Sequence, residues 1–201
     1  MSKPVIDFYF DFISPYSYLA ATRLDAFSQQ HHVDFQWLPV NLPKLIKWSG
    51  NTPPATIKNK AIYCLRDSKR WATVLDVPFT MIKPGSFDSR PAMRCALDMQ
   101  DKKRRRFCIA VFNSIWSGAV DPKQSDWLQQ VVALYDLPQS WLSGLADQSE
   151  QEAQLNALTE QALHAGAFGV PTFYLHHGRG RPEMFFGVDH MDFLARACGS
   201  L

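Results

Sequence analysis

The chain has 201 residues, of which 46% are hydrophobic and 20% are charged, and its formal net charge is +2. These totals are typical of a globular protein that can bury a full core, as one domain or as one domain with an insertion. The small net charge does not favour a nucleic acid or a membrane surface as partner, and the one basic run, Lys102 to Arg106, is typical of a solvated helix face. The sequence shows no signal peptide and no apolar run long enough to span a bilayer, so we expect a cytoplasmic protein.

The cysteines and histidines form no metal-binding or redox pattern. No two cysteines are spaced as C-x-x-C, and the six histidines show no H-x-x-x-H or H-E-x-x-H pattern. Each cysteine lies in an apolar helical pattern, as buried reduced cysteines do. We therefore expect no metal ion, and reduced core cysteines at Cys64, Cys95, Cys108 and Cys198.

The first predicted element is a strand that leads directly into a helix. Apolar and polar side chains alternate over residues 6–12, as in a β-strand. Helical spacing then takes over and continues to Gln30. Ser14 is a favoured N-cap residue and Pro15 is well tolerated at the first helical position, so the helix is predicted to begin there.

A second strand and a long helical region follow. Residues 33–37 alternate again, which predicts a parallel strand–helix–strand unit of the usual right-handed kind. From Pro43 to Leu163 no segment is convincing as a strand, and apolar residues recur at helical spacing instead. The expected helices cover residues 57–75, 89–97, 102–117, 125–135, 139–148 and 149–165.

Strands return near the C-terminus. Residues 172–176 and 183–186 flank a glycine-rich turn at 177–180, which predicts a β-hairpin. Asp189 is then predicted to cap a last helix.

Without the helical region, this order of elements is that of a thioredoxin-like domain. We therefore expect an α/β protein with a thioredoxin-like fold and an inserted all-α domain. The thioredoxin-like domain is formed by residues 1–41 and 164–201, and the insertion by residues 42–163.

Two serines, Ser14 and Ser17, stand where thioredoxin-like folds carry the cysteines of a C-x-x-C motif. The start of a helix presents unpaired N–H groups that stabilise an anion. The site therefore keeps a geometry that favours a thiolate but has no thiol of its own, and a thiol brought by another molecule would complete it. The alternative is that Ser14 is only a helix cap.

The second informative segment is Val170-Pro171, directly before a predicted strand. A proline in this place suits a cis peptide bond in a tight turn. In the thioredoxin layout it lies beside the start of the first helix, and the main-chain groups of Val170 are free to bind an extended peptide as an added strand. The alternative is an ordinary proline between a loop and a strand.

Four motifs, in order along nearly the whole chain, resemble those of 2-hydroxychromene-2-carboxylate isomerases. These enzymes are relatives of kappa-class glutathione transferases and of DsbA-like disulfide oxidoreductases. The motifs are residues 8–20 (FYFDFISPYSYLA), 50–54 (GNTPP), 168–172 (FGVPT) and 185–189 (FFGVD).

The resemblance implies a homodimeric enzyme that uses glutathione as cofactor, with Ser14 as the catalytic serine that stabilises the thiolate. Glutathione contacts are implied at Ser14, Tyr16, Asn51, the main chain of Val170, Val188 and Asp189. Val188 stands where the family usually has Asn or Ser, so only a main-chain contact remains there. Asp189 is implied to receive the amino group of the γ-glutamyl residue.

The implied reaction converts a 2-hydroxychromene-2-carboxylate into a trans-o-hydroxybenzylidenepyruvate. A ring must open and a carbon–carbon double bond must rotate, which reversible addition of a thiolate makes possible. An anionic aromatic substrate also needs a cation. Lys44 and Lys47, in the predicted loop beside Asn51, are candidates, and the alternative for each is a solvated surface lysine.

Three other functions remain open at this point. A kappa-like glutathione transferase would consume glutathione, whereas an isomerase would not. A disulfide oxidoreductase is disfavoured because C-x-x-C is absent. A non-catalytic module would bind a peptide or glutathione without raising the thiolate fraction.

Overall fold

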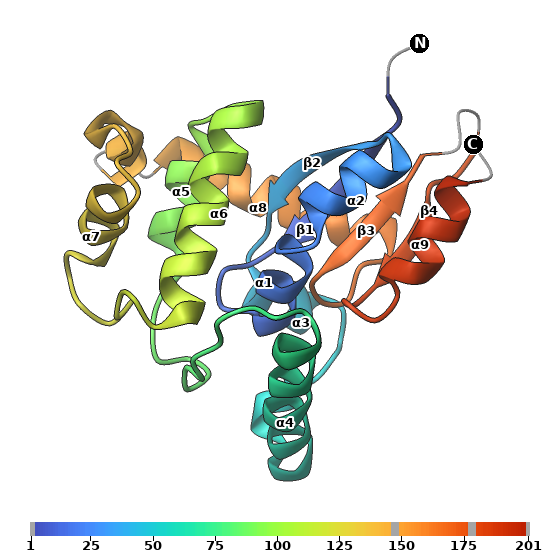
Figure 1. Cartoon of the computed structure of the whole chain (residues 1–201), viewed down its shortest axis with the longest axis horizontal. Coiled ribbons are helices and arrows are strands. Elements are labelled where there is room, and N and C mark those ends of the chain that lie inside the picture. The colour runs from blue at the N-terminus through green and yellow to red at the C-terminus, as the bar shows by residue number, and fades with distance from the viewer. Residues whose placement is uncertain (1–2, 146–148, 177–179, 200–201) are drawn as a thin grey trace.

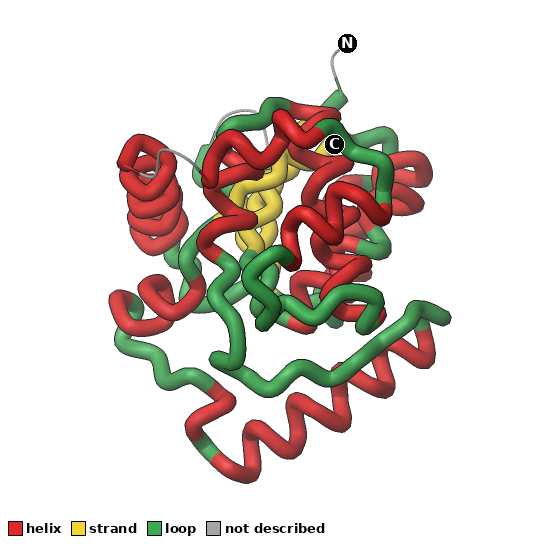
Figure 2. The backbone as a smooth tube through the Cα atoms, turned by 90° about the vertical axis from the view of Figure 1, so that its left-hand side faces the viewer, coloured by secondary structure: helices red, strands yellow, loops and turns green. Residues whose placement is uncertain are grey.

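The computed structural model describes residues 3–145, 149–176 and 180–199. A four-stranded sheet lies in the middle of the molecule with helices on either side (Figure 1, Figure 2). The strands are β1 (Val5–Phe10), β2 (Asp34–Pro39), β3 (Thr172–Leu175) and β4 (Glu183–Phe186). The α-helices are α1 (Pro15–Ala21), α2 (Leu24–His31), α3 (Leu42–Trp48), α4 (Lys58–Val74), α5 (Arg90–Leu97), α6 (Asp101–Ser117), α7 (Trp127–Leu134), α8 (Ser149–Ala165) and α9 (Met191–Cys198). Two 3-10 helices are η1 (Pro54–Thr56) and η2 (Gln139–Leu145).

The strand order is β2-β1-β3-β4. β1 pairs in parallel with β2 and antiparallel with β3, and β3 and β4 form an antiparallel pair. The predicted parallel unit and the predicted C-terminal strand pair are confirmed, and the arrangement is the expected α/β, thioredoxin-like one. Most of the predicted turn, residues 177–179, lies outside the described residues.

Helices cover both faces of β1, so neither face is solvated. Phe8 and Phe10 belong to a buried cluster that also holds Leu24 of α2 and Leu194 of α9. On the opposite face, Tyr9 is 1% exposed and belongs to a second buried cluster, together with residues of α3 and α8. The side chains that alternate along β1 therefore point to two different buried faces, and neither face is exposed to solvent.

The first predicted helix is wrong in one respect, because it is two helices. Thr22 Oγ1 donates a hydrogen bond to Leu19 O (2.8 Å), and Arg23 N donates to Ala20 O (2.9 Å), three residues back. These bonds tighten and end the first helix at Ala21, and α2 begins at Leu24. The apolar spacing runs on through the break and therefore did not reveal it.

The predicted middle helices are present as α4 to α8, with residues 139–145 as the 3-10 helix η2. Their buried side chains belong to the same cluster as those of the sheet, and Trp116 Nε1 of α6 donates to Phe12 O (3.0 Å), two residues after β1 ends. The division into two domains stays a prediction. Among the described residues no helix combines the length and the hydropathy needed to cross a bilayer.

Candidate active site

Ser14 lies at the turn between β1 and α1, as predicted. It is the N-cap residue of α1, and its Oγ accepts a hydrogen bond from Ser17 N (3.1 Å). The same hydroxyl donates to Val170 O at a long 3.4 Å, and only 4% of the residue is exposed. One oxygen thus both caps the helix and faces the turn before β3.

The first turn of α1 leaves donors for an anion. Pro15 has no N–H, and no acceptor in the described part of the chain is paired with Tyr16 N. Because α1 has only 7 residues, the N–H groups of this turn and the Ser14 hydroxyl, rather than a long helix dipole, are available to stabilise a negative charge.

The Val170–Pro171 peptide bond is cis, as predicted. Pro171 O accepts a hydrogen bond from Gly187 N (2.9 Å), which ties this turn to the segment after β4. The Val170 carbonyl accepts the long 3.4 Å contact from Ser14 Oγ and keeps a second lone pair. Val170 N has no acceptor within the described residues and can still pair with a ligand.

Asn51 lies on the loop after α3 and reaches the segment that precedes the cis-proline. Its Nδ2 donates to Phe168 O (3.2 Å), while its Oδ1 accepts from Thr52 N (2.8 Å). The amide is exposed. The structure therefore brings Asn51, Val170 and Ser14 to one short stretch of chain, residues 168–171.

The Tyr16 hydroxyl is already engaged away from Ser14. It donates to Asp67 Oδ2 of α4 (3.0 Å) and lies 3.5 Å from Cys64 O. Burial raises the pKa of this hydroxyl, and the neighbouring Cys64 and Asp67 add to the shift. The hydroxyl of Tyr16 thus fixes α1 to α4, and its half-buried ring packs against the core.

Val188 is 1% exposed, and its carbonyl accepts a hydrogen bond from Arg23 Nη1 (2.9 Å). Arg23 Nη2 also pairs with Asp192 Oδ1 (3.0 Å). The side chain that replaces the family's Asn or Ser is thus packed into the core. Of the main-chain groups at Val188, the carbonyl is already engaged.

Asp189 does not cap the last helix, so that prediction is wrong. α9 begins two residues later, at Met191, and its N-cap residue is His190, without a side-chain capping bond. The Asp189 carboxylate bends back over Gly187, which has φ +93°, so closely that a Cβ on Gly187 would clash with Asp189 Oδ1. The side chain of Asp189 is 62% exposed and is free of any capping role.

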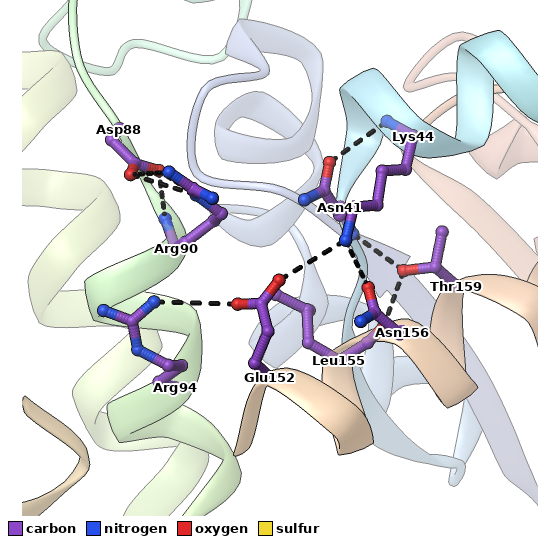
Figure 3. A network of polar contacts seen from close by, with 9 residues as sticks. All are labelled: Asn41, Lys44, Asp88, Arg90, Arg94, Glu152, Leu155, Asn156 and Thr159. Atoms are coloured by element: carbon purple, nitrogen blue, oxygen red, sulfur yellow. Dashed lines mark hydrogen bonds and ion pairs between the residues drawn. The ribbon is translucent and has the colours of Figure 1, made fainter. Parts of the chain in front are cut away.

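Lys44 and Lys47 lie on the helix α3, so the prediction that they lie in a loop is wrong. α3 forms because Asn41 caps it, with Lys44 N donating to Asn41 Oδ1 (3.0 Å). Lys44 Nζ contacts Asn156 Oδ1 (2.6 Å) and Glu152 Oε1 (3.4 Å) of α8, as Figure 3 shows. Lys44 is therefore engaged in packing, whereas Lys47 is exposed in the last turn of α3.

Asp11 is a buried carboxylate whose role the sequence reasoning missed. It is 0% exposed and accepts hydrogen bonds from Ile13 N, Leu42 N and Ser89 Oγ. Burial raises the pKa of Asp11 to about 6, although these hydrogen bonds oppose the shift. Ser89 is the N-cap residue of α5 but makes no capping bond, because its hydroxyl is turned to Asp11. The alternation over residues 6–12 places Asp11 on the polar face of the strand, so no signal in the sequence indicated that this carboxylate is buried.

A cavity of about 380 Å³ lies on η1 and the start of α4. It is lined by Pro54, Asn59, Lys60, Tyr63 and Cys64. The carbonyl of Cys64 lies 3.5 Å from the Tyr16 hydroxyl, but Ser14, Asn51 and Val170 are not among the residues that line this cavity. Its combination of apolar surface with a lysine was not recognised in the sequence, where the segment was predicted only as the start of a helix.

The cysteines of the chain are free. Burial raises the pKa of Cys95 to about 12, with Asp98 adding to the shift, and also raises the pKa values of Cys108 and Cys198. These three thiols are poor sources of a thiolate. Among the described residues no group of three His, Cys, Asp or Glu side chains is arranged to hold a metal ion.

The sheet, the cis-proline and the serine-capped first helix define a thioredoxin-fold protein that lacks the dithiol. Residues 5–199 match the family described as DSBA-like thioredoxin domain, and the chain belongs to this family.

Within this family the chain is similar to two kinds of enzyme. It is 30% identical over 209 residues to a 2-hydroxychromene-2-carboxylate isomerase of Pseudomonas putida, covering 98% of this chain and 95% of the relative. It is 28% identical over 204 residues to glutathione S-transferase kappa 1 of Caenorhabditis elegans, covering 96% and 89%. A solved structure of a 2-hydroxychromene-2-carboxylate isomerase matches with a TM-score of 0.84 at 26% identity, over 98% of this chain and 95% of that one. The resemblance predicted from the four motifs is confirmed.

Proposed function

We propose that the protein is a glutathione-dependent isomerase that converts 2-hydroxychromene-2-carboxylate-type compounds into trans-o-hydroxybenzylidenepyruvate-type products. The similarity to enzymes named as such isomerases supports the reaction, and the kappa relatives support the cofactor. The observation that carries the proposal is the place of Ser14, whose hydroxyl stands at the first turn of α1 and faces the carbonyl before cis-Pro171. The proposal includes a cytoplasmic homodimer, as the resemblance implies.

The residues at this turn fit a thiol-bearing peptide. The Ser14 hydroxyl donates only one long hydrogen bond, of 3.4 Å, and Tyr16 N has no acceptor among the described residues. Both groups can therefore donate to a sulfur anion. Val170 N is open to main-chain pairing, and Asn51 lies at the same stretch of chain. When bound, glutathione supplies a reversible thiol nucleophile, the chemistry that rotation about a conjugated double bond requires.

The aromatic substrate needs an apolar surface and a cation. The cavity of about 380 Å³ beside Tyr16 offers both, through Tyr63 and Lys60. Its volume lies within the range of small-molecule sites, roughly 300–1,000 Å³. Lys47, exposed on α3, remains a second candidate for the carboxylate.

The proposal is tested by turnover of 2-hydroxychromene-2-carboxylate, followed by absorbance with and without reduced glutathione. We expect turnover only with glutathione, and no net loss of it. Ser14→Ala should lower kcat by about a hundredfold, the effect of removing one donor to a developing anion. Ser17→Ala is the matched control, because its buried Oγ has no partner among the described residues and its loss should leave turnover unchanged.

Cys64 is only half-buried, so it is the cysteine of this chain that could act as a nucleophile in place of glutathione. Turnover that needs no glutathione and disappears in Cys64→Ser would contradict the proposal. A kappa-like transferase is the alternative function. It is favoured by the 28% identical kappa relative, and its mark is glutathione consumed in proportion to product.

A further inference from the structure

The segment that carries Ser14 is held by hydrogen bonds from three directions. Phe10 O accepts from Val40 N (2.9 Å), and Phe12 O accepts from Trp116 Nε1 (3.0 Å). Between them, Asp11 O accepts from Ser14 N (3.1 Å). The main chain of Ser14 is therefore anchored on Asp11, and the position of Asp11 sets the position of the Ser14 hydroxyl.

The Asp11 carboxylate is itself held by three separate parts of the chain. Oδ1 accepts from Ile13 N (3.1 Å) in the same turn and from Ser89 Oγ (2.7 Å), and Oδ2 accepts from Leu42 N (2.9 Å). No cation pairs with it in the described part of the chain. Burial of a charge without a partner is costly, so these three donors fix its orientation.

The two remote donors belong to helices that are joined to each other. Leu42 is the first residue of α3, and Ser89 directly precedes α5. Glu152 of α8 bridges Lys44 Nζ of α3 (3.4 Å) and Arg94 Nη1 of α5 (3.7 Å), as Figure 3 shows.

The contacts therefore close a ring that runs from Asp11 through α3, α8 and α5 and back to Asp11. A shift of any one of these helices must strain a polar contact in the ring, and Asp11 is the point where the ring meets the turn of Ser14.

We propose that Asp11 is a positioning residue for Ser14, and that the ring through α3, α8 and α5 holds Asp11 in place. The inference rests on the proposed function in so far as Ser14 serves a thiolate. Asp11 itself touches neither cofactor nor substrate.

In Asp11→Asn, the loss of the negative charge and the loss of positioning should shift the pKa of the bound thiol in opposite directions. A buried carboxylate near a thiolate disfavours the anion, so removing the charge alone would lower the pKa of the bound thiol. Asp11→Asn also places an amide N–H against one of two main-chain donors, Leu42 N or Ile13 N, in either orientation of the amide, which disturbs the turn. If the loss of positioning dominates, the Ser14 hydroxyl no longer faces the anion and the thiol pKa rises.

The first experiment needs no cofactor. Ser17 N donates to Ser14 Oγ, so amide hydrogen exchange at Ser17 reports whether the hydroxyl is in place. We expect Asp11→Asn to speed this exchange about fivefold, the change that losing an N-cap produces, and to match Ser14→Ala. Asp98→Asn is the control, since Asp98 also accepts from two side chains, Gln151 and Ser143, but away from the turn. Unchanged exchange at Ser17 in folded Asp11→Asn would overturn the proposal.

Ser89→Ala keeps the test valid if Asp11→Asn does not fold. It removes only the 2.7 Å donor and leaves the carboxylate, and it should speed exchange at Ser17 in the same direction by a smaller factor. Exchange at Ser17 equal to that of the unmodified protein would count against the ring.

The second experiment measures the pKa of glutathione bound to each variant by thiolate absorbance. We expect a higher thiol pKa in Asp11→Asn than in the unmodified protein. A lower or equal value would overturn the positioning role. If the unmodified protein does not bind glutathione, the proposed function fails, and the exchange rate at Ser17 alone decides the role of Asp11.

Discussion

At the scale of single residues, the candidate site depends on hydroxyl and carboxylate groups whose partners the structure now defines. Ser14 Oγ accepts from Ser17 N and faces Val170 O, so one side chain links the helix start to the cis-proline turn. Asp189, by contrast, is free of the capping role that its place before a helix suggested. Its carboxylate is 62% exposed and lies 4.0 Å from His190 Nε2.

Asp189→Asn should leave the melting temperature unchanged, because no capping bond is lost. If the carboxylate meets the amino group of glutathione, affinity should fall about fivefold, since an ion pair at a site that is 62% exposed contributes about 1 kcal/mol. Titration calorimetry against glutathione checks this. Equal affinity for both proteins would remove Asp189 from the binding site.

Asp11 should make the protein less stable as the pH rises, whereas most carboxylates of folded proteins have the opposite effect. Its pKa of about 6 in the fold lies above the ordinary 3.8, so the folded state holds the proton more tightly than the unfolded chain does. The stabilisation is complete below pH 3.8 and is lost as the pH rises through about 6.

Relative to Asp11→Asn, the unmodified protein should therefore lose about 2 kcal/mol of unfolding free energy between pH 4 and pH 7. Urea unfolding at several pH values measures this difference. A difference that stays constant over this range would show that Asp11 titrates normally.

At the scale of elements, the two lysines of α3 differ in their contacts. Lys44 contacts Asn156 and Glu152 and so fixes α3 to α8, whereas Lys47 is exposed one turn later. The two lysines were predicted as equivalent candidates for the substrate carboxylate. The structure makes them a matched pair for experiment.

Lys44→Gln should lower the unfolding free energy by about 1 kcal/mol, because it breaks partly exposed polar contacts to α8, and should leave KM for the aromatic substrate unchanged. Lys47→Gln should do the reverse, with stability unchanged and KM raised if Lys47 binds the carboxylate. Thermal unfolding and steady-state kinetics of both variants separate the two roles. An increase in KM with Lys44→Gln alone would contradict this assignment.

The features predicted correctly are those encoded within a few neighbouring residues. Alternation predicted β1, the Ser14-Pro15 pair predicted the start of α1, and the proline before β3 predicted the cis bond. The end of α1 was missed because the hydroxyl of Thr22 ends it without interrupting the apolar spacing.

Contacts between distant parts of the chain could not be predicted in this way. The donors to Asp11 include Leu42 and Ser89, which are 31 and 78 residues away in sequence, and Glu152 lies 108 residues from Lys44. Nothing in the local pattern shows which helix ends will meet such a carboxylate. The same holds for Asp189, whose turn over Gly187 delays the start of α9.

At the scale of the whole molecule, α4 stands out from the body at the bottom of Figures 1 and 2. Only Ser68 and Ala72 of this helix are buried, and both lie in its C-terminal half. Ile62 is 39% and Tyr63 is 60% exposed. An apolar surface on a protruding helix is typical of a protein–protein contact, and it supports the predicted homodimer.

We therefore predict a dimer by sedimentation velocity, and a shift toward monomer in Ile62→Glu, which places a charge on the exposed surface of α4 at a residue that does not line the cavity. Leu134→Glu is the control, because Leu134 is 55% exposed on α7, far along the chain from this surface. A monomer at all concentrations, or equal dimerisation in both variants, would contradict the prediction.

The most direct test of the account is the ionisation of glutathione bound to the protein. Thiolate absorbance is followed as a function of pH for the unmodified protein and for Ser14→Ala, each saturated with glutathione. We expect a thiol pKa below the free value of about 8.5 in the unmodified protein and a return toward that value in Ser14→Ala. A bound thiol that ionises as free glutathione does, or equally in both proteins, would contradict the claim that Ser14 serves a thiolate supplied by another molecule.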